Sequence, residues 1–247
     1  MTGIPTATTG ASRKRGRLAL AASLAAIAAG TQPALATPQA AGGLVEVGVE
    51  QDIRYATRRN FTGRVLPGYC EPKGLLLRPA ARRLLEVHAE LGRGLGLGLK
   101  VYDAYRPLRA THAMVRWAER TGNRALLDGG YIARRSNHNL ATTVDLTLVD
   151  VSRRDHPELD MGTAYDAFSP RSATLNARGE ALRNRLILKR AMEAHGFRNY
   201  PREWWHYDSR RPGPRALDVP IGTSSTRRGC PPPASPRSPP AVRESGT

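Results

Sequence analysis

Residues 136–151 read SNHNLATTVDLTLVDV, and the second half of this stretch, from Thr143 to Val151, is rich in β-branched residues. Such a composition is typical of a buried β-strand. Asp145 interrupts the apolar run, and burying a carboxylate is costly unless it is paired or bound to a metal. His138 lies seven residues before Asp145, in a polar turn. The stretch therefore predicts a central strand that also carries part of a functional site.

Helical and extended patterns surround this strand. Apolar spacing with a proline at the start predicts helices at 79–91 and 107–120, and a third helix at 178–195 is ended by Gly196. Alternating apolar residues predict further strands at 97–105 and 204–207. The order of these elements contains no regular βαβ repeat. We therefore expect an α+β fold, a single domain with a mainly antiparallel sheet flanked by helices.

The 247 residues suffice for one ordinary domain with extensions. A charged segment before the apolar run LALAASLAAIAA, followed by Ala34-Leu35-Ala36, is typical of a secretory signal. The expected regions are a signal peptide at 1–36, a linker at 37–44, the folded domain at 45–209 and a basic, Pro-rich, largely disordered tail at 210–247. This organisation predicts an exported protein, in the periplasm, the cell wall or outside the cell, with an N-terminal membrane anchor as the alternative.

The formal net charge of +17 suggests a polyanionic partner. However, the basic residues are spread along the chain, and no aromatic-basic module accompanies them. We therefore do not expect nucleic acid as a partner. The apolar run at 18–29 is too short for a spanning helix, so we expect no stable membrane insertion.

Two cysteines, Cys70 and Cys230, lie far apart in the sequence. In an exported protein they could pair. Because Cys230 falls in the Pro-rich tail, for which we expect no fixed position, the sequence favours unpaired cysteines and leaves a disulfide open. The wide spacing does not form a metal-binding knuckle.

Residues 203–206 read EWWH, a rare pattern of two tryptophans between a glutamate and a histidine. On a regular strand Glu203 and His206 would point to opposite faces, so a bulge or a strand end is needed to bring both to one ion. Together with His138 and Asp145, they supply the ligand types and the general base of a hydrolytic zinc site. Read alone, the segment is also compatible with a core tryptophan pair that has solvated neighbours.

Arg106 lies in the segment YDAYRP at 102–107. Pro107 favours an extended conformation at Arg106, which places the guanidinium at a junction between a strand and a helix. A guanidinium fixed there could stabilise a developing oxyanion. An ordinary salt bridge to Asp103 is the alternative.

Taken together, these segments resemble the zinc D-alanyl-D-alanine dipeptidases, the family that includes the vancomycin-resistance dipeptidases. The resemblance covers about residues 55–207 and consists of YATRRNFTG with Gly68-Tyr69, YDAYRP, SNHNLATTVDLTL, MGTAYD and EWWHY, in the family's order. It implies one zinc ion per chain, in a cleft of the sheet, with His138, Asp145 and His206 as ligands.

The resemblance also implies roles for other residues. Glu203 would act as general base and then as proton donor, and Arg106 would steady the tetrahedral intermediate. The residues implied in substrate binding are Ser136, Asp166, Tyr55 and Asp103. Of these, Asp166 is a candidate for holding the substrate ammonium, and Asp103 for supporting Arg106 or a pocket group.

The sequence departs from the family pattern S-x-H-x-x-G-x-A-x-D at two positions. Ala141 stands at the glycine position and Thr143 at the alanine position. If the glycine has a positive φ, Ala141 is strained by about 1 kcal/mol. Since all the implied ligands and the base are present, we expect activity with an altered pocket shape.

The resemblance implies zinc-dependent hydrolysis of D-alanyl-D-alanine to two D-alanines in cell-wall peptide metabolism, with a small D-amino-acid dipeptide as substrate. One alternative is a zinc D,D-carboxypeptidase or endopeptidase that acts on longer peptidoglycan stem peptides. Another is a non-catalytic wall-binding module, which the intact Glu203 argues against. Export favours the recycling of wall peptides, and the basic charge suggests a weak association with anionic cell-wall polymers.

Overall fold

The computed structural model describes residues 43–213, 215–224, 226–227 and 229–230. The expected signal peptide, nearly all of the expected linker and residues 231–247 lie outside the described residues. The strands are β1 (Leu44–Glu46), β2 (Glu50–Gln51), β3 (Leu75–Leu77), β4 (Leu97–Asp103), β5 (Thr143–Asp150), β6 (Phe197–Asn199) and β7 (His206–Ser209). The α-helices are α1 (Arg78–Leu95), α2 (Leu108–Arg120), α3 (Arg124–Asp128) and α4 (Gly179–Ala194). Short 3-10 helices are η2 (Arg54–Ala56), η3 (Asn137–Leu140) and η4 (Pro170–Ser172).

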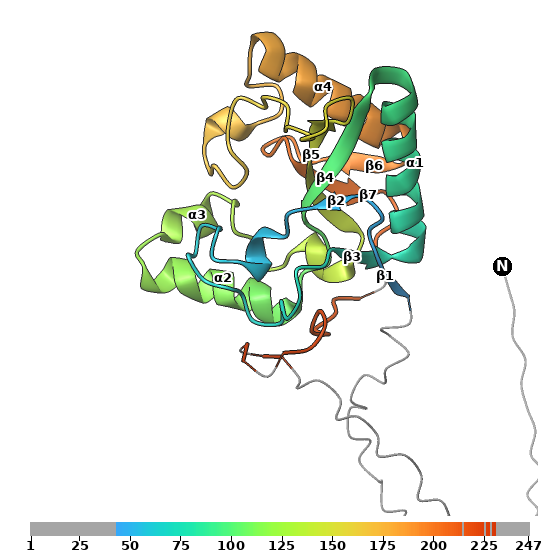
Figure 1. Ribbon diagram of the computed structural model, residues 1–247. Helices are drawn as coiled ribbons and strands as arrows, with labels where there is room; N and C mark the ends of the chain where they lie inside the picture. The colour runs from blue at the N-terminus through green and yellow to red at the C-terminus, as the bar shows by residue number, and fades with distance from the viewer. Residues whose placement is uncertain (1–42, 214, 225, 228, 231–247) are drawn as a thin grey trace, which may run out of the picture. The chain divides into compact units, whose positions relative to one another are not determined.

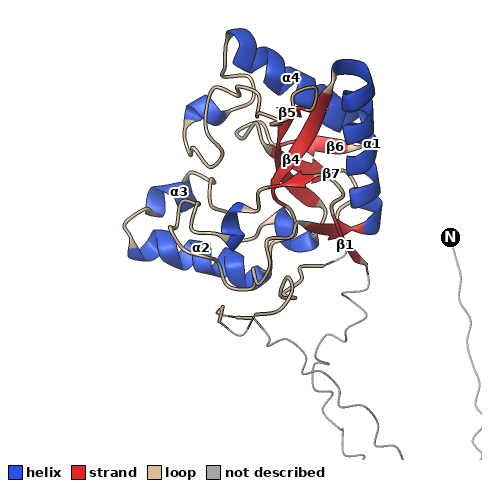
Figure 2. Ribbon diagram, in the orientation of Figure 1, coloured by secondary structure: helices blue, strands red, loops and turns tan. Residues whose placement is uncertain are grey.

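Five of the strands form one sheet in the order β2-β4-β5-β7-β6, while β1 and β3 pair separately. β2 runs parallel to β4, and every other neighbouring pair in this sheet is antiparallel. Figure 2 shows the strands enclosed by helices. The arrangement confirms the α+β fold with a mainly antiparallel sheet. The stretch 143–150 is its central strand, and all of its residues except Asp150 are buried.

The two faces of the sheet have different coverings. Helices α1 and α4 contact one another and pack on the sheet, whereas α2 and α3 lie on the opposite side from α1 (Figure 1). Because side chains alternate along a strand, Val144 and Leu146 point toward the face that α1 and α4 cover, and Asp145 points to the opposite face. One face thus contributes to the hydrophobic core, and the other is available for a polar site.

A β-bulge in β4 determines which of its side chains reach that polar face. Val101 pairs with Leu146 and Asp103 pairs with Asp145, so that Tyr102 is an extra residue on β4. Without the bulge, Asp103 would be turned toward the core, since a shift of one residue exchanges the two faces. The bulge therefore places the carboxylate of Asp103 beside that of Asp145.

The strand expected at 204–207 begins only at His206, which corrects the sequence-based boundary. Trp204 and Trp205 form a turn that is closed by the His206 amide, which donates to the Glu203 carbonyl at 3.3 Å. Both indoles are buried. Consecutive side chains on a strand point to opposite faces, whereas a turn lets both tryptophans enter the interior. The turn is also the strand end that Glu203 and His206 need to approach one ion.

Described residues between 210 and 230 pack on the domain, although the sequence places them in the expected disordered tail. Leu217 and Ile221 are buried. The amide of Ile221 donates to the Gly68 carbonyl at 2.8 Å, and its own carbonyl accepts from the amide of Cys70 at 3.1 Å. Burial of these apolar side chains and the backbone pairing offset the entropy lost on ordering the segment.

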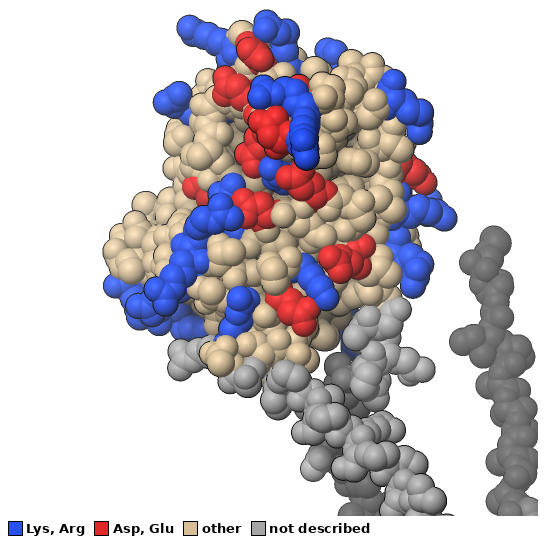
Figure 3. Space-filling view, in the orientation of Figure 1, with Lys and Arg blue, Asp and Glu red and all other residues tan. Residues whose placement is uncertain are grey.

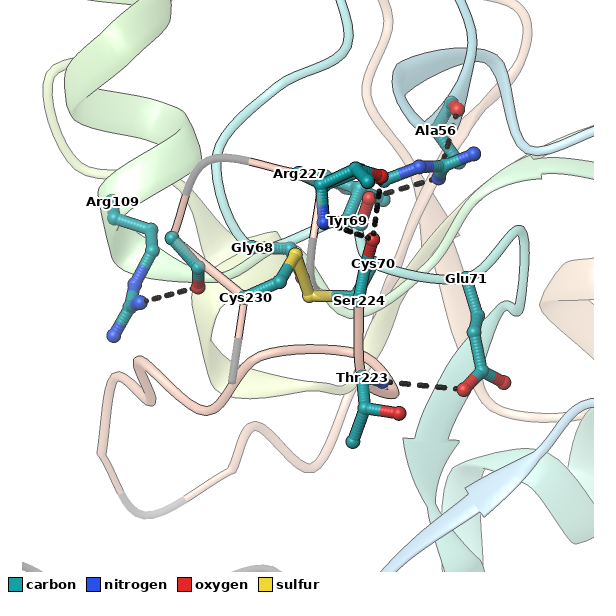
Figure 4. The surroundings of a disulfide bond; sticks show 12 residues. Ala56, Gly68, Tyr69, Cys70, Glu71, Arg109, Thr223, Ser224, Arg227 and Cys230 are labelled. Atoms are coloured by element: carbon teal, nitrogen blue, oxygen red, sulfur yellow. Dashed lines mark hydrogen bonds between the residues drawn. A yellow bond between two sulfur atoms is a disulfide. The ribbon is translucent and has the colours of Figure 1, made fainter. Parts of the chain in front are cut away.

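Cys70 and Cys230 form a disulfide, contrary to the expectation of unpaired cysteines (Figure 4). Beside it, the Arg227 guanidinium donates to the carbonyls of Ala56 at 3.3 Å and Tyr69 at 3.2 Å. Sequence reasoning missed the pairing because it assigned Cys230 to a segment with no fixed position. The disulfide ties this segment to the loop that carries Tyr69.

Some of the basic side chains at the surface form ion pairs with acidic ones. Lys100 Nζ lies 2.7 Å from Glu50 Oε1, and Arg109 Nε lies 3.0 Å from Asp218 Oδ1. On the face shown in Figure 3, acidic side chains lie among basic ones. Within the part of the chain that the structure describes, no helix combines the length and the apolar character that crossing a bilayer requires.

Removal of the disulfide by Cys70→Ala with Cys230→Ala is expected to lower the free energy of unfolding by about 2–5 kcal/mol, because the cross-link closes a loop of 160 residues. Urea unfolding of the oxidised wild type and the double variant measures this. A reductant should move the wild-type midpoint toward that of the variant and leave the variant unchanged. An unchanged wild-type midpoint under reducing conditions would contradict the cross-link.

Candidate metal centre

Three side chains from separate segments converge on the polar face of the sheet. His206 Nδ1 lies 3.0 Å from Asp145 Oδ1, and His138 Nε2 lies 3.2 Å from the same oxygen. The two histidine nitrogens are 3.3 Å apart. Ligand atoms around a tetrahedral zinc ion lie about 3.3 Å from one another, given bonds of about 2.0–2.1 Å. The spacing fits one face of a metal's tetrahedron, and the three residues form a metal-binding triad.

Sheet register brings two of these ligands together. Asp145 on β5 and His206 on β7 are direct cross-strand partners. In an antiparallel pair, opposite residues point to the same face with Cβ atoms about 5 Å apart. The pairing therefore places a carboxylate and an imidazole side by side without any loop.

The third ligand is presented by η3. Its N-cap residue Ser136 accepts a hydrogen bond from the His138 amide at 3.3 Å, and the Asn139 side chain accepts one from the Ser136 amide at 3.3 Å. His138 Nδ1 lies 2.7 Å from the Ala104 carbonyl oxygen. Because a carbonyl oxygen only accepts, Nδ1 carries the proton and Nε2 is left with the lone pair that a metal requires.

Ala141 ends η3 with φ +57° and ψ +32°, the positive φ considered for this position. The left-handed conformation costs alanine about 1 kcal/mol relative to glycine. The methyl group is fully buried, which contributes about 0.8 kcal/mol in the other direction. The two effects nearly cancel, so alanine can stand here without a large loss of stability.

Arg106 is held in a fixed position beside the triad. Asp103 Oδ2 accepts from Arg106 Nε at 3.0 Å and from its terminal nitrogen Nη2 at 2.8 Å, while the Tyr69 hydroxyl donates to Asp103 Oδ1 at 2.5 Å. The guanidinium lies 4.9 Å from the ring centroid of Tyr55 and 3.9 Å from Asp145 Oδ2. Burial lowers the pKa of Arg106, but the Asp103 carboxylate and the surrounding tyrosines together outweigh it and keep the pKa well above its usual value. The group stays charged.

The Glu203 carboxylate lies at the edge of the triad, with Oε2 3.8 Å from His206 Nδ1. The side chain is buried. Burial raises the pKa of Glu203 to about 7, although the nearby His206 opposes the shift. A carboxyl with a pKa near neutrality can both accept and return a proton.

A cavity of about 250 Å³ lies against these groups, and the sequence-predicted residues Tyr55, Ser136 and Asp166 also line it. The Tyr55 hydroxyl donates to Asp166 Oδ1 at 3.2 Å and to Oδ2 at 3.1 Å. Asp166 has φ +59°, a conformation that non-glycine residues often adopt at functional sites. Burial, together with the Asp145 carboxylate, raises the pKa of Asp166 well above its usual value. Among the predicted residues, Asp103 lies behind Arg106 rather than at the cavity.

Sequence reasoning missed Tyr165. Its hydroxyl donates to Asp145 Oδ2 at 3.0 Å, and the same oxygen lies 3.1 Å from the Tyr55 hydroxyl. It thereby links the triad to the wall of the cavity. The available signal was its place directly before Asp166 in the segment MGTAYD.

Asp208 was also missed. His206 Nε2 lies 3.3 Å from Asp208 Oδ1. Although burial raises the pKa of Asp208, the hydrogen bond and charge of His206 and the hydrogen bonds of Thr143 and Asn137 together outweigh it, and the pKa falls to about 2. The available signal was its position two residues after His206, which places both side chains on one face of a strand.

Comparisons with known proteins agree with this geometry. Residues 42–219 match the model of the Peptidase M15 family, described as D-ala-D-ala dipeptidase. The D-alanyl-D-alanine dipeptidase of Enterococcus faecalis is 36% identical over 178 residues, which cover 65% of this chain and 85% of that protein. The enzyme of the same name from Enterococcus faecium is 34% identical over 192 residues, 70% of this chain and 93% of that protein.

The D-alanyl-D-alanine dipeptidase of Escherichia coli K12 is 33% identical over 176 residues, 70% of this chain and 83% of that protein. Among solved structures, a vancomycin resistance D,D-pentapeptidase in complex with Zn(II) is 14% identical with a TM-score of 0.35. That match covers 57% of this chain and 76% of the solved chain.

His206→Ala is expected to lower the metal content of the purified protein strongly, because only two of the three ligands remain. His195→Ala is the matched control, since His195 pairs with Glu90 on the surface at 2.6 Å and does not contact the triad. Elemental analysis after dialysis against a weak chelator measures both variants. Equal metal content in His206→Ala and wild type would refute the triad.

Glu203→Gln is expected to stabilise the metal-free protein above pH 7 and to have little effect near pH 4. The wild-type fold favours the protonated carboxyl, whose pKa rises from 4.5 to about 7, so it loses stability as the pH rises through this range. The neutral amide of the variant keeps its stability as the pH rises. The difference in the free energy of unfolding between variant and wild type should therefore reach the order of 3 kcal/mol. Urea unfolding from pH 4 to 8.5 in excess chelator measures the gap, and a constant difference across this range would contradict the expectation.

Proposed function

This chain belongs to the Peptidase M15 family of D-Ala-D-Ala dipeptidases, and on that premise we propose that it hydrolyses D-alanyl-D-alanine to two D-alanines, using one zinc ion held by the triad. The observation that carries the proposal is the meeting of the triad, Glu203 and Arg106 at one small cavity. Metallopeptidase membership follows from the family, while the substrate and the identity and number of the metal ions belong to the proposal.

A zinc ion held by His138, Asp145 and His206 would supply Lewis acidity toward water and the scissile carbonyl. The ligands suit this ion, because their donor set of two imidazole nitrogens and one carboxylate oxygen is common in catalytic zinc sites. Metal binding requires an unprotonated nitrogen on each histidine. The Ala104 carbonyl holds the proton of His138 on Nδ1. Burial lowers the pKa of His206, but the hydrogen bonds to Asp145 and Asp208 and the nearby carboxylates raise it to about 10, so a metal has to displace a proton from this residue.

Glu203 is the proposed general base. In its charged form it takes a proton from the attacking water and then passes it to the leaving amine. A nearby dication favours the charged carboxylate, so the pKa of Glu203 in the working enzyme lies below that of the metal-free protein. Arg106 faces the negative charge that develops on the carbonyl oxygen, and Asp103 keeps its guanidinium in place.

Asp166 is proposed to bind the substrate ammonium. Burial and the Asp145 carboxylate raise its pKa. A cationic group bound beside it would lower this pKa and so favour the ionised carboxylate, which in turn attracts the cation. At the other end, Arg135 also lines the cavity and supplies a basic group for the substrate carboxylate. The two anchors together select a peptide with both ends free.

The size of the cavity supports a dipeptide over a longer stem peptide. Its volume of about 250 Å³ lies below the range of about 300–1,000 Å³ that is common for ligand sites. A zinc D,D-carboxypeptidase acting on stem peptides would need an open groove for the rest of the chain. The small cavity therefore favours the dipeptidase over the carboxypeptidase.

Export remains a proposal. The apolar run at 18–29 and the following Ala34-Leu35-Ala36 support a secretory signal. The disulfide between Cys70 and Cys230 adds independent support, since such bonds persist mainly in oxidising compartments. In such a location the protein would act on wall-derived peptides, with weak association to anionic wall polymers.

Release of D-alanine from D-Ala-D-Ala and from a wall pentapeptide, with and without a chelator, tests the substrate. We expect cleavage of the dipeptide, loss of cleavage with the chelator and recovery on adding Zn²⁺. Cleavage of the pentapeptide in place of the dipeptide would move the assignment to a carboxypeptidase. Failure of the zinc-loaded protein to cleave either peptide would refute the proposed hydrolysis.

Glu203→Ala is expected to retain bound zinc and to lose turnover by a factor of about 10²–10⁴, the usual contribution of a general base. Steady-state rates on D-Ala-D-Ala and elemental analysis of the same samples measure the two properties. Turnover equal to that of the wild type would remove Glu203 from the mechanism.

A further inference from the structure

A second cross-strand pair lies directly beside the ligand pair. Thr143 on β5 is opposite Asp208 on β7, two residues along from the pairing of Asp145 with His206. With the two-residue period of a strand, all four side chains point to the same face. The register that forms the metal-binding pair therefore also forms an outer pair next to it.

Hydrogen bonds connect this outer pair to a ligand. The Thr143 hydroxyl donates to Asp208 Oδ1 at 2.8 Å, and His206 Nε2 lies 3.3 Å from the same oxygen. An ionised carboxylate only accepts, so Nε2 is held as a donor, and Nδ1, which faces the triad, is the nitrogen left to bind a metal. Asp208 thus selects the tautomer of His206 that can bind a metal.

Asp208 needs support to hold this position. Its side chain is partly exposed, at 16%, and a carboxylate at the edge of a cavity can rotate into solvent. Thr143 is fully enclosed in the central strand, at 1% exposure, and its χ1 angle is restricted by β-branching. A rigid donor on β5 therefore fixes a more mobile acceptor on β7.

We propose that Thr143 is a positioning residue of the metal centre, which acts through Asp208 to fix the orientation and tautomer of His206. The inference rests on the metal triad and not on the identity of the substrate.

The test compares Thr143→Val, which removes the hydroxyl and keeps a β-branched side chain, with Thr143→Ser, which keeps the hydroxyl. Thr142→Val is the matched control, because the Thr142 hydroxyl accepts from the Gly213 amide at 3.2 Å and does not contact Asp208. The measurement is the Zn²⁺ dissociation constant, by competition with a chromophoric chelator at pH 7.5. The visible spectrum of the Co²⁺-loaded proteins reports the ligand geometry.

Loss of a group that orients a ligand typically weakens metal affinity 10–100-fold. We expect Zn²⁺ binding to weaken about 10-fold in Thr143→Val, with an altered Co²⁺ spectrum. Thr143→Ser and Thr142→Val should bind like the wild type. Since the effect passes through Asp208, Thr143→Val should add little to the loss caused by Asp208→Asn.

Wild-type affinity in Thr143→Val would overturn the proposal, as would full additivity with Asp208→Asn or failure of the serine variant to retain affinity. If the valine variant does not fold, Thr143→Ala serves in its place, with the same expected loss. Because metal affinity is measured without substrate, a protein inactive on D-Ala-D-Ala that still shows the loss would refute the proposed hydrolysis and leave this inference standing.

Discussion

The pairing of β5 with β7 is the constraint on which the rest of the structure depends. Asp145 and His206 become ligands of one site only because they are opposite one another in this register. A slip by one residue would turn one of them toward the core and separate the pair. The other face of β5 is hydrophobic and packs against α4, while α1 covers the neighbouring β4. A slip would therefore be costly, since it would expose the buried Val144 and Leu146 to a polar surface. The core therefore fixes the geometry of the metal centre.

Charge balance is the second constraint. The site brings the carboxylates of Asp103, Asp145, Asp166 and Glu203 close to the guanidinium of Arg106, all in a largely buried region. Negative charge exceeds positive charge, and burial makes this excess expensive. The raised pKa values of Glu203 and Asp166 express this cost. A divalent cation in the triad and an ammonium at Asp166 would offset it, so the excess of buried negative charge favours the binding of metal and substrate.

Neighbouring side chains and a disulfide hold this arrangement in place. The buried Trp204 indole N–H donates to the Thr163 hydroxyl at 2.8 Å, and the Trp205 ring packs 5.5 Å from that of Tyr165. The loop with Tyr165 is thereby fixed against the turn that carries Glu203. On the other side, the disulfide and the segment before Cys230 hold the loop of Tyr69, whose hydroxyl binds Asp103. The tryptophan contacts thus position the wall of the pocket, and the disulfide helps to position Arg106 through Tyr69 and Asp103.

The fold class could be predicted from the sequence, because periodic apolar residues specify helices and strands. The kind of site was indicated by EWWH and by Asp145 within an apolar strand, since a buried carboxylate needs a partner or a metal. Which distant residues contact one another depended on the tertiary structure. The bulge that turns Asp103 to the polar face, the contact between Thr143 and Asp208, and the disulfide all join residues distant in the chain. No local pattern encodes these contacts, since they arise from strand register and from packing against the finished core.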